Sequence, residues 1–80
     1  MIKIKLYGTL SDYGGPRLFS AEAKNVRMAL NQATAMGVDK TLLSGALIFV
    51  NNRQLSGVMR LSRRLNDGDE LALLSPAGGG

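Results

Sequence analysis

Apolar and polar residues alternate at the start of the chain. In the segment IKIKLY at residues 2–7, the even positions are isoleucine or leucine, and the odd positions are lysine or tyrosine. Alternation with a period of two is typical of a strand that has one buried face. The segment SDYGGP at residues 11–16 then predicts a turn, because glycine and proline interrupt regular structure. RLFSAE at residues 17–22 predicts a shorter strand that returns antiparallel to the first.

The period of the pattern lengthens after residue 24. The side chain of Asn25 can accept hydrogen bonds from the free amides of a first helical turn, and Gly37 can end a helix in a left-handed conformation. We therefore predict a helix over residues 26–36 with one apolar stripe. Residues 38–45 are interpreted as a loop with at most one short helical turn. The residues that form the apolar stripe are Val26, Ala29, Leu30 and Ala33.

The remaining sequence predicts three more strands, separated by turns. ALIFV at residues 46–50 forms the third strand, NNR is suited to a tight turn, and residues 54–55 pair back as a short fourth strand. In NDGD, Gly68 is free to adopt a positive φ, and the last strand covers residues 70–75. The element order predicts an α+β fold, a mixed sheet of four to five strands with one main helix packed on one face.

The third and last strands are apolar on both sides, and one helix can cover only one side. We expect the uncovered side, together with Tyr7 of the first strand, to form an exposed apolar surface opposite the helix. Such a surface either docks a partner or is ordinary exposed apolar area. The residues on the uncovered side are Leu47, Phe49, Ala72 and Leu74, and those on the covered side are Ile48, Val50, Leu71 and Leu73.

Length and composition restrict the available functions. The 80 residues are predicted to form one domain, residues 1–75, followed by a glycine-rich tail, residues 76–80. Cysteine and histidine are absent, so the usual nucleophile and base are missing, and we expect no metal site. The apolar runs are too short to cross a bilayer and there is no signal-peptide pattern, so we expect a cytoplasmic protein without a membrane partner.

The net charge of +4 raises the question of an acidic partner. Arg53, Arg60, Arg63 and Arg64 are close together in the sequence and would attract phosphates. The chain has only two tyrosines and two phenylalanines, without the interleaving of aromatic and basic residues that stacks nucleic-acid bases. A solvated face or a protein-docking surface is therefore favoured, and nucleic acid is not an expected partner.

The internal side chains do not form a recognisable active site. The serines have no histidine partner, and Asp67 and Asp69 flank Gly68, where we interpret them as turn-forming residues. The chain is therefore not predicted to be an enzyme on its own.

The terminal segment SPAGGG indicates a different kind of chemistry. Pro76 stiffens the exit from the last strand, and Ala77, Gly78 and Gly79 would allow the tail to pass through a narrow channel, because glycine has no Cβ. The reactive group that such a tail delivers is the α-carboxylate of Gly80. A carboxylate resists substitution until ATP converts it to an acyl-adenylate, which sulfide or an amine can attack.

Several segments together resemble a known family. NVRMAL at residues 25–30, LNDGDELALLSP at residues 65–76 and the terminal glycine pair are similar to sulfur carriers with the ubiquitin-like β-grasp fold. Within this MoaD/ThiS type, the chain resembles most closely the small subunit of molybdopterin synthase. The opening segment IKIKLYGTLSDYGG is also similar to that subunit, in which the first strand leads into a short helical turn that ends at glycine.

The resemblance implies a function for the tail. An E1-like adenylating enzyme would use ATP to adenylate Gly80, and sulfur from a persulfide donor would leave a thiocarboxylate there. The domain itself would hold no cofactor. In molybdopterin synthase the tail enters the large subunit, and the docking face that the resemblance implies includes Tyr7 and Leu74, with Phe49 expected nearby.

Other functions remain open at this point. The same fold and tail would suit a sulfur carrier of another pathway, such as thiazole or cysteine synthesis, or a ubiquitin-like modifier of lysines. A β-grasp binding module with a passive tail is a further alternative. Two features depart from the family pattern: three terminal glycines instead of two, and Ser75 at a position where the molybdopterin subunit often has proline.

Overall fold

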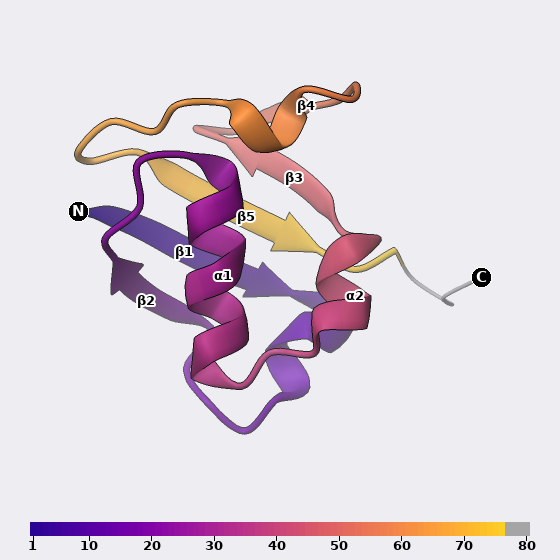
Figure 1. The fold of residues 1–80 in the computed structure, drawn as a ribbon. Helices are drawn as coiled ribbons and strands as arrows, with labels where there is room; N and C mark the ends of the chain where they lie inside the picture. The colour runs from indigo at the N-terminus through magenta and orange to yellow at the C-terminus, as the bar shows by residue number, and fades with distance from the viewer. Residues whose placement is uncertain (77–80) are drawn as a thin grey trace.

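Five strands form one mixed sheet in the computed structural model, which describes residues 1–76. The strands are β1 (Ile2–Tyr7), β2 (Leu18–Ala21), β3 (Leu47–Val50), β4 (Arg53–Leu55) and β5 (Glu70–Leu74). Their order across the sheet is β2-β1-β5-β3-β4, so the last strand of the chain lies in the centre (Figure 1). β5 runs parallel to β1 and antiparallel to β3, and the two edge strands are antiparallel to their neighbours.

The helix α1 (Val26–Met36) crosses one face of this sheet (Figure 1). Its ends are those that the sequence predicts. The side chain of Asn25 accepts a hydrogen bond from the Met28 amide at 2.8 Å, and Gly37, with a φ of 111°, donates from its amide to the carbonyls of Ala33 and Thr34. The small side chains of Ala29 and Ala33 are fully buried, which allows the helix to lie close to the sheet.

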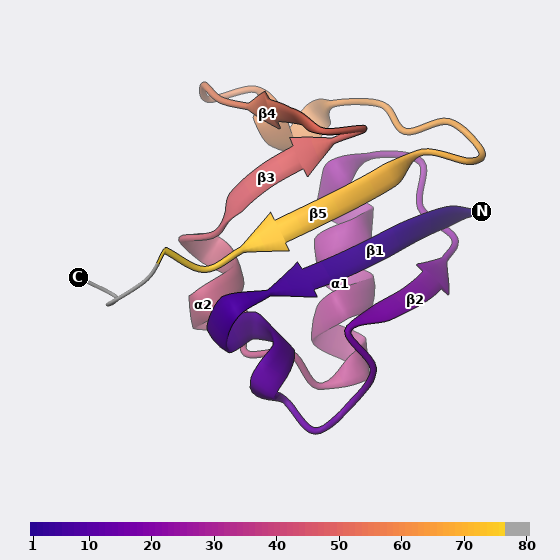
Figure 2. The same ribbon diagram turned by 180° about the vertical axis from the view of Figure 1, so that it is seen from behind.

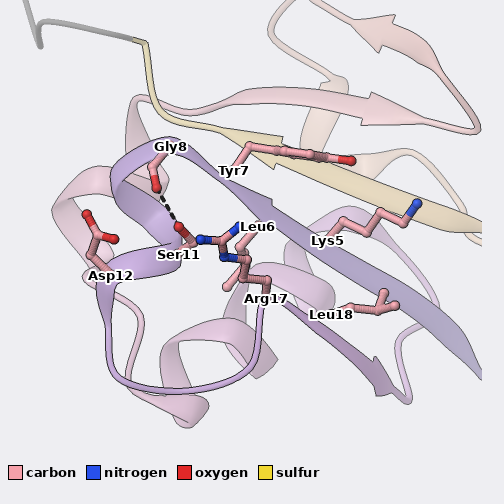
Figure 3. A pocket seen from close by; sticks show the side chains of 8 residues that line it. All are labelled: Lys5, Leu6, Tyr7, Gly8, Ser11, Asp12, Arg17 and Leu18. Atoms are coloured by element: carbon pink, nitrogen blue, oxygen red, sulfur yellow. Dashed lines mark hydrogen bonds between the residues drawn. The ribbon is translucent and has the colours of Figure 1, made fainter.

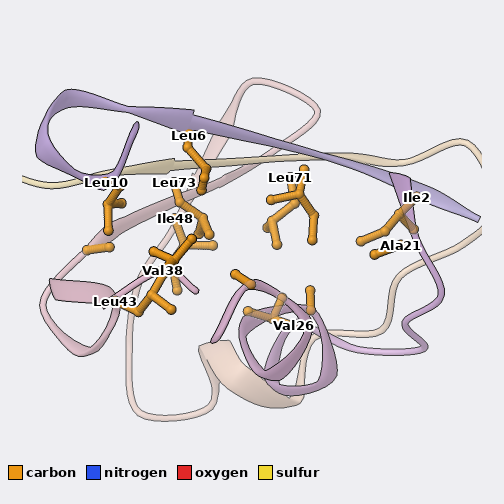
Figure 4. Close-up of a cluster of buried hydrophobic side chains, with 14 of the residues drawn as sticks. Ile2, Leu6, Leu10, Ala21, Val26, Val38, Leu43, Ile48, Leu71 and Leu73 are labelled. Carbon is orange, nitrogen blue, oxygen red and sulfur yellow. The ribbon is translucent and has the colours of Figure 1, made fainter. Parts of the chain in front are cut away.

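The covered side of the sheet and the inner side of α1 form the core. Alternation places one set of strand residues against the helix, and this set is nearly inaccessible to solvent. Figure 4 shows these side chains between β1, β5 and α1. The strand residues of the core include Ile2, Ile4, Leu6, Ile48, Val50, Leu71 and Leu73, and the helix contributes Val26.

Three short helices connect these elements. η1 (Gly8–Asp12) and η2 (Arg60–Ser62) are 3-10 helices, and α2 (Lys40–Ser44) lies in the segment interpreted as a loop with at most one helical turn. Asp39 begins α2, because its carboxylate accepts hydrogen bonds from the amides of Thr41 and Leu42 at 2.7 and 3.3 Å. The 3-10 helix η2 was not predicted from the sequence. In the opening segment, the resemblance had implied a helical turn that ends at glycine, and η1 ends at Asp12, before Gly14.

The tight turns have the predicted chemistry. Asn51 and Asn52 connect β3 to β4 with φ values of 49° and 71°, a left-handed conformation that asparagine tolerates better than most residues. Gly68 has a φ of 88° in the turn before β5. β1 has the predicted bounds, and the other four strands differ from the predicted ones by one residue at one or both ends, which is the usual uncertainty of strand ends. Among the helices of residues 1–76, none is long and apolar enough to cross a membrane.

Candidate docking face and chain exit

The side of the sheet opposite α1 carries the apolar surface that the sequence predicts. Tyr7, Phe49, Ala72 and Leu74 line a shallow depression of about 390 Å³ together with Asn52. We call the first four of these residues the open face. Tyr7 is 47% exposed, and Tyr7 and Leu74 are paired across β1 and β5. Figure 2 shows this side of the sheet without a helix in front of it. The structure therefore brings the three predicted docking residues together, and their use in docking stays a prediction.

A second depression adjoins the open face and shares Tyr7 with it. It measures about 430 Å³ and lies between β1, η1 and the start of β2 (Figure 3). Leu18 pairs with Lys5 across the two strands, is 50% exposed and lines the depression with the cationic Arg17. Neither Arg17 nor Leu18 was predicted from the sequence to line a site. A usable signal was present, because alternation in RLFSAE places the apolar Leu18 on the same side as Ser20.

One ion pair lies on the same side of the sheet. Lys5 Nζ is 3.1 Å from Glu70 Oε1, and both side chains are about one-third exposed. The hydrogen bond to Glu70, followed by the charge of that carboxylate, raises the pKa of Lys5 above its ordinary value. The pair neutralises part of the positive charge beside Tyr7, because the carboxylate of Glu70 carries the opposite charge.

The chain leaves β5 beside the end of β1. Gly8 follows β1 with a φ of 63°, and a Cβ at this position would lie 3.2 Å from the carbonyl oxygen of Ser75. Glycine is therefore required here for two reasons, the left-handed backbone and the close approach of Ser75. Pro76 is exposed and lines a small depression with Thr41 and Leu42 of α2. The predicted tail residues Ala77, Gly78, Gly79 and Gly80 lie outside the described residues.

Hydrogen bonds fix the turn that precedes β5. Asp69 accepts from the Asn66 amide at 2.8 Å and from the Asn51 side chain at 3.0 Å, and Asn51 in turn accepts from the Glu70 amide at 3.0 Å. The bond from Asn66, followed by the bond from Asn51, lowers the pKa of Asp69. Asp69 is thus turn-forming, as predicted, whereas Asp67 pairs with the N-terminal ammonium of Met1.

The arginine cluster is spread over the helix side and one edge of the sheet. Arg53 begins β4, Arg60 begins η2, and Arg63 and Arg64 follow η2. Arg60 donates to the Gly57 carbonyl at 3.0 Å. Within residues 1–76 the arginines form no ion pair, and no group of three or more acidic side chains is arranged to hold a metal ion.

A mixed five-stranded sheet with a parallel central pair and one main helix across one face defines a ubiquitin-like β-grasp protein. The model of the ThiS family matches residues 4–80, and the chain belongs to this family. It therefore has the fold of the ubiquitin-like sulfur carriers, the family that its sequence resembles. No curated protein matches the chain.

Solved structures similar to this chain carry several functional names. Small archaeal modifier protein 1 from Methanosarcina acetivorans has a TM-score of 0.80 at 22% identity, covering 99% of this chain and 95% of that one. Urm1 from Trypanosoma brucei has a TM-score of 0.74 at 20% identity, covering 99% and 94%. The complex of subunits 1 and 2 of the molybdopterin-converting factor from Helicobacter pylori has a TM-score of 0.66 at 23% identity, covering 99% and 97%. At these identities the likeness shows the fold.

Proposed function

We propose that this protein is a sulfur carrier that acts through the carboxylate of Gly80, most directly as the small subunit of a molybdopterin synthase. The single observation that carries the proposal is the match to the ThiS family, which extends to Gly80 itself. The open face and the chain exit support it. The open face is apolar and lies next to the point at which the chain leaves β5, as docking by this face would require.

The chemistry needs an activating partner. ATP transfers its adenylyl group to the Gly80 carboxylate, pyrophosphate leaves, and the carbonyl carbon becomes electrophilic. Hydrosulfide then attacks that carbon and expels AMP, which leaves a thiocarboxylate on the chain. The E1-like enzyme supplies ATP binding and catalysis in this proposal, since the sequence contains neither the pattern of a phosphate-binding loop nor a histidine or cysteine.

The open face provides the docking in this proposal. Tyr7, Phe49 and Leu74 seat the domain on a partner, and Pro76 directs Ala77, Gly78 and Gly79 into the active site of that partner. The partner that completes the synthase is a larger subunit, as subunit 2 accompanies subunit 1 in the Helicobacter pylori complex. The cytoplasm is the location that these partners imply.

Intact mass spectrometry tests the chemistry directly. The protein is incubated with a cognate E1-like enzyme, ATP and sulfide, and it should gain the mass difference between sulfur and oxygen, located on Gly80 by fragmentation. Omitting ATP should prevent the change. A chain extended beyond Gly80 should remain unmodified, whereas an N-terminal extension should be tolerated. If the activating enzyme forms no adenylate with the intact, folded chain, the carrier function is wrong.

Protein modification is a second candidate. The small archaeal modifier and Urm1 structures resemble this chain about as closely as the molybdopterin-converting factor structures do, with TM-scores of 0.80 and 0.74 against 0.73 and 0.66. A modifier would use the same adenylate but would transfer the Gly80 carbonyl to a lysine amine. An isopeptide-linked Gly80 on a target protein, together with the absence of sulfur transfer to a pterin precursor, would favour this function over the synthase.

A further inference from the structure

A separate depression lies on the helix side of the sheet, between α1, α2 and η2. Its apolar walls are Leu30 of α1, Leu43 of α2 and Leu61 of η2, and its volume is about 170 Å³. Leu43 is buried, and Leu30 and Leu61 are half-buried against the core. We call this depression the helix-side groove. Figure 1 shows its three helices on the same side of the sheet. The polar residues that complete its lining are Arg27, Asn31, Thr34, Lys40 and Ser44.

The surroundings of the helix-side groove are cationic. Arg27 and Lys40 are exposed at its rim, and the arginines of η2 and the following residues add charge to the same side. The helices α1, α2 and η2 contain no acidic residue. The nearest acid in the sequence, Asp39, already accepts two amide hydrogen bonds from α2. The ion pairs found within residues 1–76 lie elsewhere and join Met1 to Glu22, Met1 to Asp67 and Lys5 to Glu70.

We propose that the helix-side groove binds an acidic segment of a partner protein, one that presents one or two aliphatic side chains between Asp or Glu residues. The leucine walls take the aliphatic side chains, and Arg27 and Lys40 pair with the flanking carboxylates. The groove has unpaired cations, and its three helices supply no anion. An acidic partner therefore complements its charge.

The size and the lining of the helix-side groove argue against two other kinds of ligand, small molecules and nucleic acids. Its volume of about 170 Å³ is below the roughly 300–1,000 Å³ typical of small-molecule sites. Nucleic acid would use the same cations, but bases bind to proteins largely by stacking on aromatic rings. The groove lining contains no aromatic residue, and Tyr7 and Phe49 lie on the open face, on the other side of the sheet.

The location makes this surface independent of the sulfur chemistry. The open face and the helix-side groove lie on opposite sides of the sheet (Figures 1 and 2). A partner seated in the groove leaves the open face uncovered. The inference therefore adds a second interaction surface and does not depend on the proposed function.

Peptide titration followed by heteronuclear NMR tests the inference on the full chain. The probes are synthetic peptides of Glu and Asp that contain two adjacent Leu, Ile or Val residues. Matched peptides replace either the acids by Gln and Asn or the aliphatic pair by Ser, and a single-stranded DNA oligonucleotide is titrated in parallel. We expect saturable shifts of amides around Leu30, Leu43 and Leu61. Raising the salt from about 0.1 M to about 1 M shortens the Debye length from about 10 Å to about 3 Å and should weaken binding several-fold.

A double charge reversal identifies the cations that bind the peptide. Arg27→Glu with Lys40→Glu should weaken binding by about tenfold, because each change replaces an attraction by a repulsion. Both positions lie in the first turn of a helix, where a carboxylate is favourable, so the fold is retained. The matched control is Arg53→Glu, an exposed arginine of β4 outside the groove lining, and it should change the affinity less than about twofold.

Four results would overturn the inference. The first is the absence of saturable binding by any acidic aliphatic peptide, and the second is a set of shifts that map to the open face. The third is that the neutral peptide binds as well as the acidic one, or that the double reversal binds the acidic peptide as well as the unmodified protein does. The fourth is that the oligonucleotide binds more tightly than the acidic peptide, which would identify a nucleic-acid surface. The titration uses neither ATP nor an activating enzyme, so its failure and the failure of the sulfur-carrier function are distinguishable.

Discussion

Replacing Leu74 by arginine separates docking from folding. Leu74 is the last residue of β5, half-buried on the open face, where it pairs with Tyr7 and Leu47 across the sheet. Its side chain is only partly exposed in the free domain, so part of its surface is already covered. Burial of a whole leucine side chain is worth about 1.5–3 kcal/mol. Loss of this burial, with the desolvation of a charge at the interface, should weaken partner binding at least about tenfold.

The same substitution should have little effect on the free domain. The aliphatic part of arginine can lie over Tyr7 while the guanidinium remains in water, so the free energy of unfolding should fall by less than about 1 kcal/mol. For 80 residues the total stability is of the order of 4–12 kcal/mol. The neighbour Leu73 points to the core and is 0% exposed. Leu73→Arg should therefore unfold the domain, since a buried unpaired charge costs several kcal/mol.

Affinity and stability are measured on the same preparations. Calorimetric or surface-binding titration with the activating enzyme gives the affinity, and thermal unfolding followed by circular dichroism gives the stability. Met36→Arg is the matched control, because Met36 is 44% exposed at the end of α1 and lies away from the open face. If Leu74→Arg binds as well as the unmodified chain, the open face is not the docking surface. If Leu74→Arg unfolds while Leu73→Arg does not, the core side and the open face of the sheet have been assigned the wrong way round.

Two further predictions concern the supports of the chain exit. Gly8→Ala should destabilise the domain by about 1–3 kcal/mol, through the left-handed backbone and the 3.2 Å approach to Ser75, measurable as a lower urea midpoint; an unchanged midpoint would refute the constraint. Hydrogen bonds from Asn66 and Asn51 lower the pKa of Asp69 in the folded state, so its stabilising contribution is present above the unfolded pKa of about 3.9 and is lost as the pH falls through the folded pKa. Asp69→Asn should remove this part of the acid-dependent loss of stability, and an unaltered pH profile would contradict it.

Sequence patterns predicted the elements that are determined by residues close together in the sequence. The strand β1 follows from alternation, α1 follows from its Asn25 cap and its stripe, and the β3–β4 turn follows from two asparagines that adopt positive φ. The open face was also predictable, because a double-sided apolar strand beside a single helix must leave one side uncovered. Tyr7, Phe49 and Leu74 lie together for this reason.

Features that depend on tertiary packing were not predictable in this way. The 3-10 helix η2 spans Arg60–Ser62, which is too short to show a period, and the half-burial of Leu61 arises from packing against the core. The helix-side groove needs η2 to lie beside α1 and α2, and η2 is distant from both of them in the sequence. The antiparallel pairing of β2 with β1 was predicted. The depression that Arg17 and Leu18 line with η1 was not, because it depends on how η1 packs beside the two strands.

The sheet order bears on how the proposed carrier would present its terminus to a partner. β5 is central, bonded to β1 on one side and β3 on the other, so the point from which the chain leaves the sheet is held more firmly than it would be at an edge. The last pair in the parallel register joins Tyr7 to Leu74, and Ser75 follows directly against Gly8. A partner that grips Tyr7 and Leu74 therefore fixes the start of the tail within two residues of Pro76. In the proposed function, docking at Tyr7 and Leu74 would therefore also position the chain exit at Pro76 through the backbone of β5, and the partner would supply the channel and the chemistry.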